Sequence, residues 1–324
     1  MRAPPQRSRL PDGRLHLHDG PIDLIIEAFG EPSDIENAYA AAWGRFATIL
    51  DELCGELPLL RARATPTSLP LAGAVARRMT DAVAPLCVER FITPMAAVAG
   101  AVAEEVLSAM KAAAPLRRAY VNNGGDIALH LLPEESFVIG MIDRPDRPSL
   151  IGSAKVTGHD SIRGIATSGW RGRSFSFGIA DAVTVLARSA TAADAAATLI
   201  ANAVDLPGHP AISRVPAISR DPQSDLGERR VTLDVGQLTP QDIAEALTAG
   251  LEEAERLRRL DAFEAAALQL RGQALFCGLG GARNIDATVK GVRAAAREGM
   301  PTFGWRVGDR HSAALEMHGL ESLR

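Results

Sequence analysis

Aromatic side chains and an excess of charge of either sign are scarce in this sequence of 324 residues. Phe, Trp and Tyr make up 4% of the chain, which argues against a base-stacking platform for single-stranded nucleic acid. The 35 basic and 39 acidic residues give a net charge of −4, whereas nucleic-acid-binding domains usually carry a basic excess. We therefore expect no nucleic-acid partner.

Cysteine and long apolar runs are also scarce. The chain holds three cysteines, too far apart for a zinc site or a disulfide framework: Cys54, Cys87 and Cys277. The most apolar helical stretch, 94–106, includes Glu104 and Glu105 and is too short to cross a bilayer. The basic N-terminal residues are not followed by the apolar region of a secretory signal. These features predict a cytoplasmic protein with no membrane partner.

Several catalytic signatures are missing as well. The sequence has neither a P-loop nor a G-x-S-x-G motif. Its seven histidines show no paired spacing of the kind that a metal site uses. The chemistry of this chain must therefore come from carboxylates, hydroxyls, arginines and glycine-rich turns.

The sequence pattern predicts helices first, then a series of strands, and then helices again. Helical patterns are predicted for residues 34–56, 71–83, 94–106, 192–204, 240–258 and 260–270, with Ser33 or Asp34 capping the first. Strands are predicted for residues 14–18, 22–26, 118–122, 126–132, 136–142, 150–156, 162–167, 174–178, 182–187 and 230–235, and a long loop for 205–225. Several hairpin-like joints indicate an α+β fold with a largely antiparallel sheet.

The same patterns divide the chain into three parts. Residues 1–13 are rich in Pro and Arg and are expected to be a mobile N-terminus. Residues 14–272 are predicted to form a single domain. Residues 273–324 have no clear period and are treated as a C-terminal appendage whose order the pattern does not indicate.

Asp194 and Thr198 lie four residues apart in a predicted helix, so they share one face. A carboxylate and a hydroxyl in this arrangement could hold one divalent cation. The alternative is structural: with Thr191 as N-cap, Asp194 would favour the first turn of its own helix, and Thr198 would bond within that helix. The spacing leaves both interpretations open.

A glycine-rich turn follows the first strand of the predicted hairpin. A tight turn with positive φ explains part of the run Asn123, Gly124, Gly125 and Asp126. One glycine usually suffices for such a turn, whereas two beside Asn and Asp expose N–H groups and a carboxylate at one point. The run is therefore also a candidate for binding a ribose or a pyrophosphate.

A third candidate site lies at the end of the strand predicted for 162–167. Thr167, Ser168 and Gly169 are followed by Arg171 and Arg173, and guanidinium groups beside hydroxyls can clamp a phosphate. The alternative is an ordinary strand whose arginines reach solvent over an aromatic core.

Taken together, four segments resemble the ApbE-like superfamily, which comprises the FAD:protein FMN transferases and their relatives. The segments are VNNGGDI at 121–127, GIATSGW at 164–170, VTVLARSATAADAAAT at 183–198 and, more faintly, PMAAVAGAVAE at 94–104. They occur in the order that the family shows. As a whole the chain resembles an uncharacterised bacterial and archaeal branch of that superfamily more than the transferases proper.

The resemblance implies a T-fold-like structure, with helices packed on one side of the sheet, that binds FAD or a related nucleotide with Mg²⁺. Asp194 and Thr198 match the family's metal-binding Asp and Thr, and Gly100 matches a glycine of its nucleotide-binding helix. We expect a main-chain carbonyl near Val98 to complete the metal site. If transferase chemistry is retained, the acceptor is a Ser or Thr hydroxyl of a partner protein, and Asp181 is the nearest spare carboxylate that could act as base.

Two departures from the transferase pattern keep other functions open. Ala99 stands where the transferases carry Lys, and their His-Ile-Ile-Asp-Pro segment has no counterpart between 170 and 182. The alternatives are a non-catalytic nucleotide-binding module and a structural or assembly protein on the same scaffold. A homo-oligomer is compatible with the sequence, which does not decide the matter.

Overall fold

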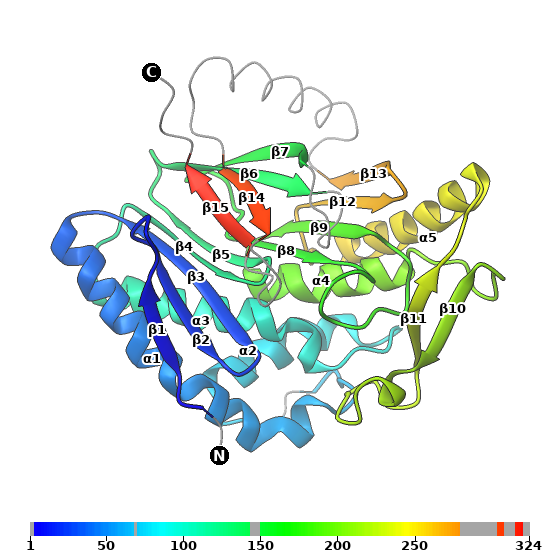
Figure 1. The fold of residues 1–324 in the computed structure, drawn as a ribbon, viewed down its shortest axis with the longest axis horizontal. Helices are drawn as coiled ribbons and strands as arrows, with labels where there is room; N and C mark the ends of the chain where they lie inside the picture. The colour runs from blue at the N-terminus through cyan, green and yellow to red at the C-terminus, as the bar shows by residue number, and fades with distance from the viewer. Residues whose placement is uncertain (1–2, 68–69, 143–149, 279–302, 308–314, 320–324) are drawn as a thin grey trace.

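The computed structural model describes residues 3–67, 70–142, 150–278, 303–307 and 315–319 (Figure 1). Its centre is a nine-stranded sheet in the order β1-β2-β3-β4-β5-β8-β9-β12-β13, in which every strand is antiparallel to its neighbours. The strands are β1 (Gln6–Arg9), β2 (Leu15–Asp19), β3 (Ile22–Phe29), β4 (Arg118–Asn123), β5 (Asp126–Leu131), β8 (Gly164–Ser168), β9 (Ala182–Ala187), β12 (Ala265–Leu270) and β13 (Gln273–Gly278).

The helices cover one face of this sheet, and a two-stranded hairpin covers part of the other (Figure 1). The helices are α1 (Pro32–Leu60), α2 (Ala74–Val83), α3 (Val98–Ala113), α4 (Ala190–Ala203) and α5 (Pro240–Arg259), with the 3₁₀ turns η1 (Ala84–Leu86), η2 (Pro94–Ala97) and η3 (Ala217–Ser219). The paired strands outside the main sheet are β6 (Ser136–Ile142) with β7 (Leu150–Thr157), β10 (Ile212–Pro216) with β11 (Arg230–Val235), and β14 (Phe303–Val307) with β15 (Leu315–Gly319). The predicted α+β fold, with a largely antiparallel sheet and helices on one side, is confirmed.

Two hydrophobic clusters hold these layers together. The larger lies between the sheet and the helices and takes side chains from all five helices. The smaller lies on the opposite face, where Phe137, Ile139 and Val156 of the β6–β7 hairpin pack against Tyr120 and Ile127. The sheet is therefore buried on both faces at its centre, which explains why its central strands lack the alternation of a half-exposed strand.

One predicted helix is wrong for this reason. Residues 260–270 end in the run AAALQL, which forms strand β12 between β9 and β13, and all six of its residues are buried. A short apolar run without a period does not distinguish a buried strand from a buried helix. Here the strand is selected by pairing with β9, a contact between distant parts of the chain.

Residues 174–178, predicted to be a strand, form a loop around the end of α4. The N–H of Phe177 and the hydroxyl of Ser176 both bond to the Asn202 side chain, at 2.8 and 3.0 Å, so these groups are satisfied without a neighbouring strand. In the opposite direction, the predicted loop at 205–225 contains β10 and η3, because β10 pairs with β11.

The sheet also extends past both predicted domain ends. Gln6–Arg9, expected to be mobile, forms edge strand β1 against β2. Gln273–Gly278, assigned to the appendage, forms the opposite edge strand β13. Of the remaining appendage, 279–302, 308–314 and 320–324 lie outside the described residues. No helix among the residues that the structure describes is both long enough and apolar enough to cross a membrane.

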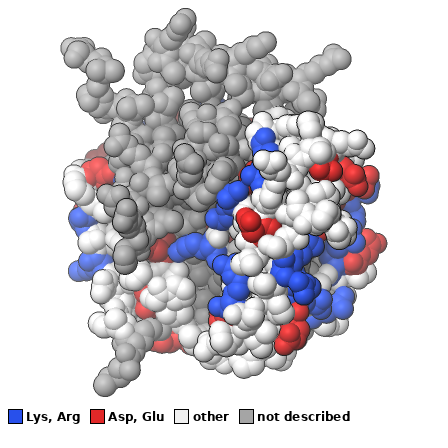
Figure 2. Space-filling view, turned by 45° about the vertical axis from the view of Figure 1, so that its right-hand side comes forward, with Lys and Arg blue, Asp and Glu red and all other residues white. Residues whose placement is uncertain are grey.

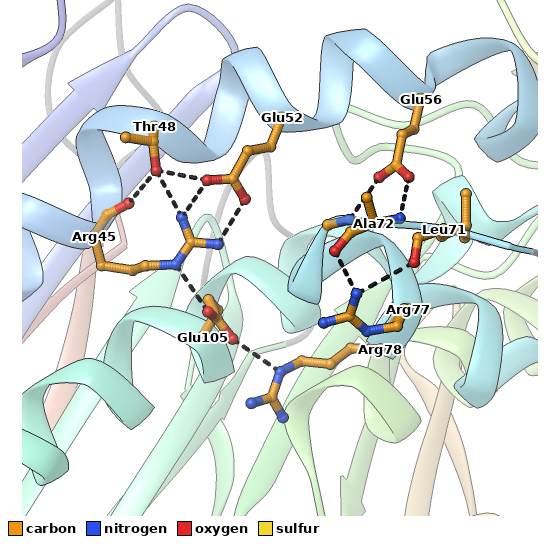
Figure 3. Close-up of polar contacts among 10 residues, drawn as sticks. Arg45, Thr48, Glu52, Glu56, Leu71, Ala72, Arg77, Arg78 and Glu105 are labelled. Atoms are coloured by element: carbon orange, nitrogen blue, oxygen red, sulfur yellow. Dashed lines mark hydrogen bonds and ion pairs between the residues drawn. The ribbon is translucent and has the colours of Figure 1, made fainter.

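A polar contact network fixes α3 against helices α1 and α2 (Figure 3). The Glu105 carboxylate of α3 accepts hydrogen bonds from Arg45 Nε of α1 at 2.8 Å and from Arg78 Nε of α2 at 3.2 Å. Arg45 also bonds both carboxylate oxygens of Glu52 at 2.8 Å. Because the Glu105 side chain is only 13% exposed, its bonds are better shielded from water than those of a surface pair.

We predict that Glu105→Gln lowers the free energy of unfolding by about 1–2 kcal/mol, since it removes the charge shared by two arginines at a partly buried position. Urea denaturation followed by circular dichroism measures this loss. The matched control is Glu52→Gln, which also faces Arg45 but is 36% exposed, and its expected cost is below about 0.5 kcal/mol. Equal losses in the two variants would contradict the prediction.

Candidate functional site

Each of the helices α3 and α4 supplies a carboxylate that bonds the N-terminus of the other. Asp194 of α4 accepts a hydrogen bond from the N–H of Gly100, in the first turn of α3, at 3.0 Å. In return, Glu104 of α3 accepts from the N–H of Ala190 at 2.9 Å and from the hydroxyl of Thr191, both in the first turn of α4. Each helix thus supplies the anion that satisfies free N–H groups at the start of the other.

Gly100 is required by this crossing. A Cβ atom at Gly100 would overlap with the main-chain carbonyl of Ala190, so only glycine lets the two helix starts approach this closely. Gly100 was predicted to bind a cofactor. The structure instead gives its position a packing reason and gives its N–H to Asp194.

The structural alternative for Asp194 and Thr198 is wrong in its particulars. Ser189, not Thr191, is the N-cap of α4, because its hydroxyl accepts from the N–H of Ala192 at 3.1 Å. Asp194 therefore lies beyond the first turn of its own helix and accepts a hydrogen bond from the first turn of α3 instead. The Thr198 hydroxyl points to the carbonyl of Ala96 at 3.5 Å rather than back into α4. Both side chains face the start of α3.

The predicted glycine-rich turn is present between β4 and β5, and both of its glycines have positive φ, 67° at Gly124 and 115° at Gly125. Asn122 Oδ1 accepts from the N–H of Gly125 at 2.9 Å. Asn123 Nδ2 donates to the carbonyl of Ala99 at 3.1 Å and ties the turn to the start of α3. The turn, α3 and α4 therefore meet at one point.

The Arg173 guanidinium lies against the same turn. A Cβ at Gly124 would overlap with Arg173 Nη2, so the missing side chain makes room for this arginine. Residue 173 belongs to a loop, so the alternative of an ordinary strand that carries Arg171 and Arg173 is wrong. Of the two predicted phosphate clamps, Arg173 reaches the turn and Arg171 does not.

Two carboxylates face a low-dielectric space at this meeting point. Burial raises the pKa of Asp194 to about 7, against the opposing effect of the Gly100 and Ala99 N–H groups. Burial and the negative charge of Asp194 raise the pKa of Asp126 well above its ordinary value, and the Thr167 N–H and Arg173 oppose this rise only in part. The pair carries more negative charge than its protein surroundings balance.

A cavity of about 340 Å³ opens over this pair. Of the predicted site residues, its wall contains Val98, Asp126, Ser168, Arg173, Asp194 and Thr198. The others lie behind or beside the wall: Gly100, Asn123, Gly124, Gly125, Thr167, Gly169, Arg171 and Asp181. Eight of the fourteen predicted site residues therefore do not line the cavity.

Asp181, proposed from sequence as a base, is held away from the cavity. Its carboxylate accepts from Arg171 Nε at 3.1 Å and from the N–H of Arg271 at 2.6 Å, and the residue is 4% exposed. A Cβ at Gly169 would lie 2.7 Å from the carbonyl oxygen of Asp181, so Gly169 serves close packing here. Thr167 is likewise engaged with the Thr184 hydroxyl at 3.0 Å. These residues position the β8 loop.

The sequence did not point to several residues of the cavity wall. They come from segments far apart in the chain and include Arg61, Phe91, Ile92, Thr93, Met95, Ala96, Ala99, Ser174, Phe175, Phe177, Asn202, Asp221, Gln223, Ser224, Asp225 and Leu226. Thr93 and Asp225 show how the segments join, because the Thr93 hydroxyl bonds the Asp225 carboxylate across 132 positions. The spacing of residues along a short segment cannot predict such a long-range contact.

The donor set fits a magnesium-class cation. Two carboxylates in excess of nearby positive charge, a hydroxyl and a main-chain carbonyl are the hard oxygens that such ions prefer. The carbonyl that meets the Thr198 hydroxyl belongs to Ala96, two residues before the predicted Val98, which contributes to the wall. Among the described residues no three His, Cys, Asp or Glu side chains form a cluster, so a protein-only cage of carboxylates is not present there.

Residues 7–276 match the protein family described as AbpE bacteria. The chain belongs to this family. The match runs from β1 to β13 and includes every residue of the cavity wall. It confirms the resemblance to the ApbE-like superfamily on which the sequence interpretation rested.

Archaeal UPF0280 proteins are similar to this chain over part of their length. The protein of Methanocaldococcus jannaschii is 39% identical over 123 residues, covering 35% of this chain and 45% of its own length. That of Methanothrix thermoacetophila is 36% identical over 160 residues, covering 48% and 64%. That of Methanosarcina acetivorans is 34% identical over 185 residues, covering 56% and 70%. The chain thus spans less than two thirds of the first two relatives.

Two solved structures are similar at low sequence identity. The flavinyl transferase ApbE of Pseudomonas stutzeri, in its apo form, gives a TM-score of 0.40 at 12% identity, over 88% of this chain and 96% of that one. The ApbE protein of Thermotoga maritima gives a TM-score of 0.42 at 11% identity, over 88% and 98%.

The carboxylate pair predicts how stability depends on pH in metal-free protein. A raised pKa means that the folded state holds protons that the unfolded chain releases above the ordinary carboxyl value of 3.8. This contribution to stability is full below that value and is lost as the pH rises through about 7. In EDTA, the thermal midpoint should therefore fall between these pH values, and Mg²⁺ should restore it.

The variant that isolates this effect is Asp126→Asn, which removes the like charge facing Asp194. Its thermal midpoint should fall less steeply with pH than that of the wild type, measured by scanning calorimetry in EDTA. An unchanged slope, or a wild-type protein that Mg²⁺ does not stabilise at neutral pH, would contradict the assignment of the pair.

Proposed function

We propose that this protein binds a flavin nucleotide together with Mg²⁺ in the cavity over α3 and α4, and that it transfers the FMN part of FAD to a hydroxyl acceptor. The observation that best supports this proposal is the pair Asp126 and Asp194, two carboxyl groups with raised pKa values at the wall of one cavity. The identity of the nucleotide comes from the family to which the chain belongs.

Each cavity residue has a role that follows from its position. Asp126 and Asp194 would hold the cation, with the Thr198 hydroxyl and the Ala96 carbonyl beside them. When bound, Mg²⁺ supplies charge neutralisation at the diphosphate and makes AMP a better leaving group. Arg173, which lies over the Gly124 turn, would donate to phosphate oxygens of the ligand.

Aromatic rings offer a place for the flat part of the ligand. Phe91 and Phe177 both contribute to the cavity wall with ring centroids 6.1 Å apart, and Phe175 lies on the same wall. Ring faces next to a polar phosphate site suit a nucleotide, which has one planar apolar end and one charged end. We propose that the isoalloxazine or the adenine ring rests here.

In the proposed reaction, the acceptor oxygen forms a bond to the FMN phosphorus as the diphosphate P–O bond breaks. AMP leaves with the electron pair, and the hydroxyl proton passes to solvent. The chain's own contribution is to fix the phosphates and to stabilise the charge that develops on the transferred group, for which Arg173 and Ser168 are placed in the wall. Asp181 is proposed to orient Arg171 and the loop after β8 rather than to take this proton.

Asp194→Asn tests the metal assignment without removing the α3 contact. The Asn side chain keeps an oxygen that can accept from Gly100 N–H but loses the charge. In wild type, Mg²⁺ should tighten FAD binding by about tenfold or more, and in the variant this dependence should vanish. Titration calorimetry with MgCl₂ or EDTA measures both, and Asp261→Asn, at a surface carboxylate that is 70% exposed, is the charge-matched control.

If Asp194→Asn retains the full response to Mg²⁺ with an unchanged thermal midpoint, Asp194 is not a metal ligand. Asp194→Ala is a poorer test, because it also leaves the Gly100 N–H without its partner.

The transfer itself is tested by incubating the protein with FAD and Mg²⁺ and measuring AMP by chromatography, with water as the acceptor. We expect AMP and FMN in equal amounts, and a loss of about tenfold or more in rate for Arg173→Gln. Arg188→Gln, at an exposed arginine that does not line the cavity, should keep the wild-type rate.

Mg²⁺-dependent FAD binding without AMP would instead favour the second candidate, a non-catalytic nucleotide-binding module. Ala99, in place of the transferase Lys, and the missing His segment favour that candidate. A protein that binds no nucleotide at all would leave a structural or assembly role.

A further inference from the structure

A second cavity, of about 420 Å³, adjoins the first on the side of β10 and β11. Its wall contains four arginines, and we call it the arginine cavity: Arg90, Arg214, Arg229 and Arg230, together with Phe91, Phe177, Leu199, Asn202, Ala203 and Asp205. Figure 2 shows Lys and Arg side chains gathered on the face that turns forward with this part of the molecule. None of the four arginines belongs to the segments that resemble the ApbE-like superfamily.

The two cavities share part of their walls. Phe91, Phe177 and Asn202 contribute to both. The shared part is rigid, because Asn202 Oδ1 accepts from both the Ser176 hydroxyl and the Phe177 N–H. A ligand anchored in the arginine cavity therefore lies directly beside the nucleotide cavity.

The charge in the arginine cavity is only partly balanced. Arg90 pairs with Glu253 at 2.9 Å, and Arg214 pairs with Asp205. Among the described residues, Arg229 and Arg230 have no carboxylate partner. Four guanidinium groups against two carboxylates leave about two positive charges, which matches the charge of −1.5 to −2 that a phosphomonoester carries at neutral pH.

The geometry of the arginines also favours a bound anion. The Arg229 guanidinium carbon lies 3.6 Å from the centroid of the Phe91 ring, and this stacking holds its plane while its N–H edges stay available. Arg230 donates to the carbonyl of Arg214 and is thereby fixed to β10. Guanidinium groups held in place bind an oxyanion at a smaller entropic cost than free surface arginines.

One donor in the wall lacks a partner. The Nε of Arg214 is buried and makes no hydrogen bond within the part of the chain that the structure describes. Buried donors are nearly always hydrogen-bonded, because leaving one unpaired is costly. Because protein atoms cover this Nε, it adds to the positive charge beside the cavity without touching the ligand itself.

We propose that the arginine cavity is a phosphate site, which binds the phosphomonoester group of a small molecule beside the nucleotide cavity. Arg229 and Arg230 supply the uncompensated charge. The site does not depend on the carboxylate pair or on Mg²⁺, so it stands or falls separately from the proposed function.

Titration calorimetry with inorganic phosphate, at constant ionic strength in chloride, tests the site directly. Wild type should bind phosphate, and Arg229→Gln/Arg230→Gln should bind it about tenfold or more weakly, because two charged donors are lost. The control Arg258→Gln/Arg259→Gln removes the same charge from two exposed positions of α5 and should bind phosphate as the wild type does. Circular dichroism and the thermal midpoint confirm that each variant is folded.

A second arm separates this site from the nucleotide site. Asp194→Asn should keep phosphate binding, and Arg229→Gln/Arg230→Gln should keep Mg²⁺-dependent FAD binding. In the Asp194→Asn variant, ribose 5-phosphate should compete with inorganic phosphate for the arginine cavity. AMP should compete as well if the phosphate of a nucleotide can enter this cavity.

Three results would overturn the proposal. The first is phosphate binding that survives in folded Arg229→Gln/Arg230→Gln. The second is equal weakening in the α5 control, which would show a general charge effect. The third is tighter binding of a hexaglutamate peptide than of phosphate, lost in Arg229→Gln/Arg230→Gln, which would make the occupant an acidic polypeptide segment.

Discussion

The crossing of α3 and α4 is the constraint on which the rest of this structure depends. Asp194 bonds the start of α3, Glu104 bonds the start of α4, and Gly100 lets the two helix starts come close enough for both bonds to form. Helix starts concentrate unsatisfied N–H groups and partial positive charge. At the crossing, each helix start is satisfied by a carboxylate of the other helix, and the Asp194 carboxylate lies at the wall of a cavity. The Gly124–Gly125 turn reaches the same point through the bond from Asn123 to Ala99.

The same contact underlies the metal site that we propose. Asp194 is fixed by the α3 start, so it cannot turn away from Asp126, and the two carboxylates confront each other where water gives little relief. Burial raises the pKa of both carboxyls, and the negative charge of Asp194 raises that of Asp126 further, so in the absence of a cation the pair favours holding a proton. Polar groups held in such an unfavourable state are typical of sites prepared for a ligand. Stability and function are therefore opposed at this pair, since the charge that would bind Mg²⁺ is the charge that weakens the metal-free fold.

The sequence predicted what is local and missed what is not. The β4–β5 turn, the extents of β6, β9 and β11, and the common face of Asp194 and Thr198 follow from residue type and spacing within a few positions. Strand β12 did not, because AAALQL is apolar throughout and becomes a strand only by pairing with β9. The roles of Gly100 and Asp181 also needed the fold. A glycine that makes room for a carbonyl 90 positions away, and a carboxylate that accepts from the main-chain N–H of Arg271, have no local signal. For the same reason spacing could not indicate the arginine cavity, whose charges come from residues 90, 214, 229 and 230.

The segment 205–235 shows how a scaffold of this kind can acquire a new specificity. The sheet and the α3–α4 crossing fix the carboxylate pair, whereas β10 and β11 stand outside the main sheet and place Arg214, Arg229 and Arg230 beside it. The two parts meet at Asn202, on the last turn of α4, whose side chain organises the loop that carries Phe177. A change in the outer hairpin can therefore alter the cavity beside the proposed nucleotide site without disturbing Asp126 and Asp194. Function in such a fold lies in what is attached to the frame, which is why a family likeness alone does not name the second ligand.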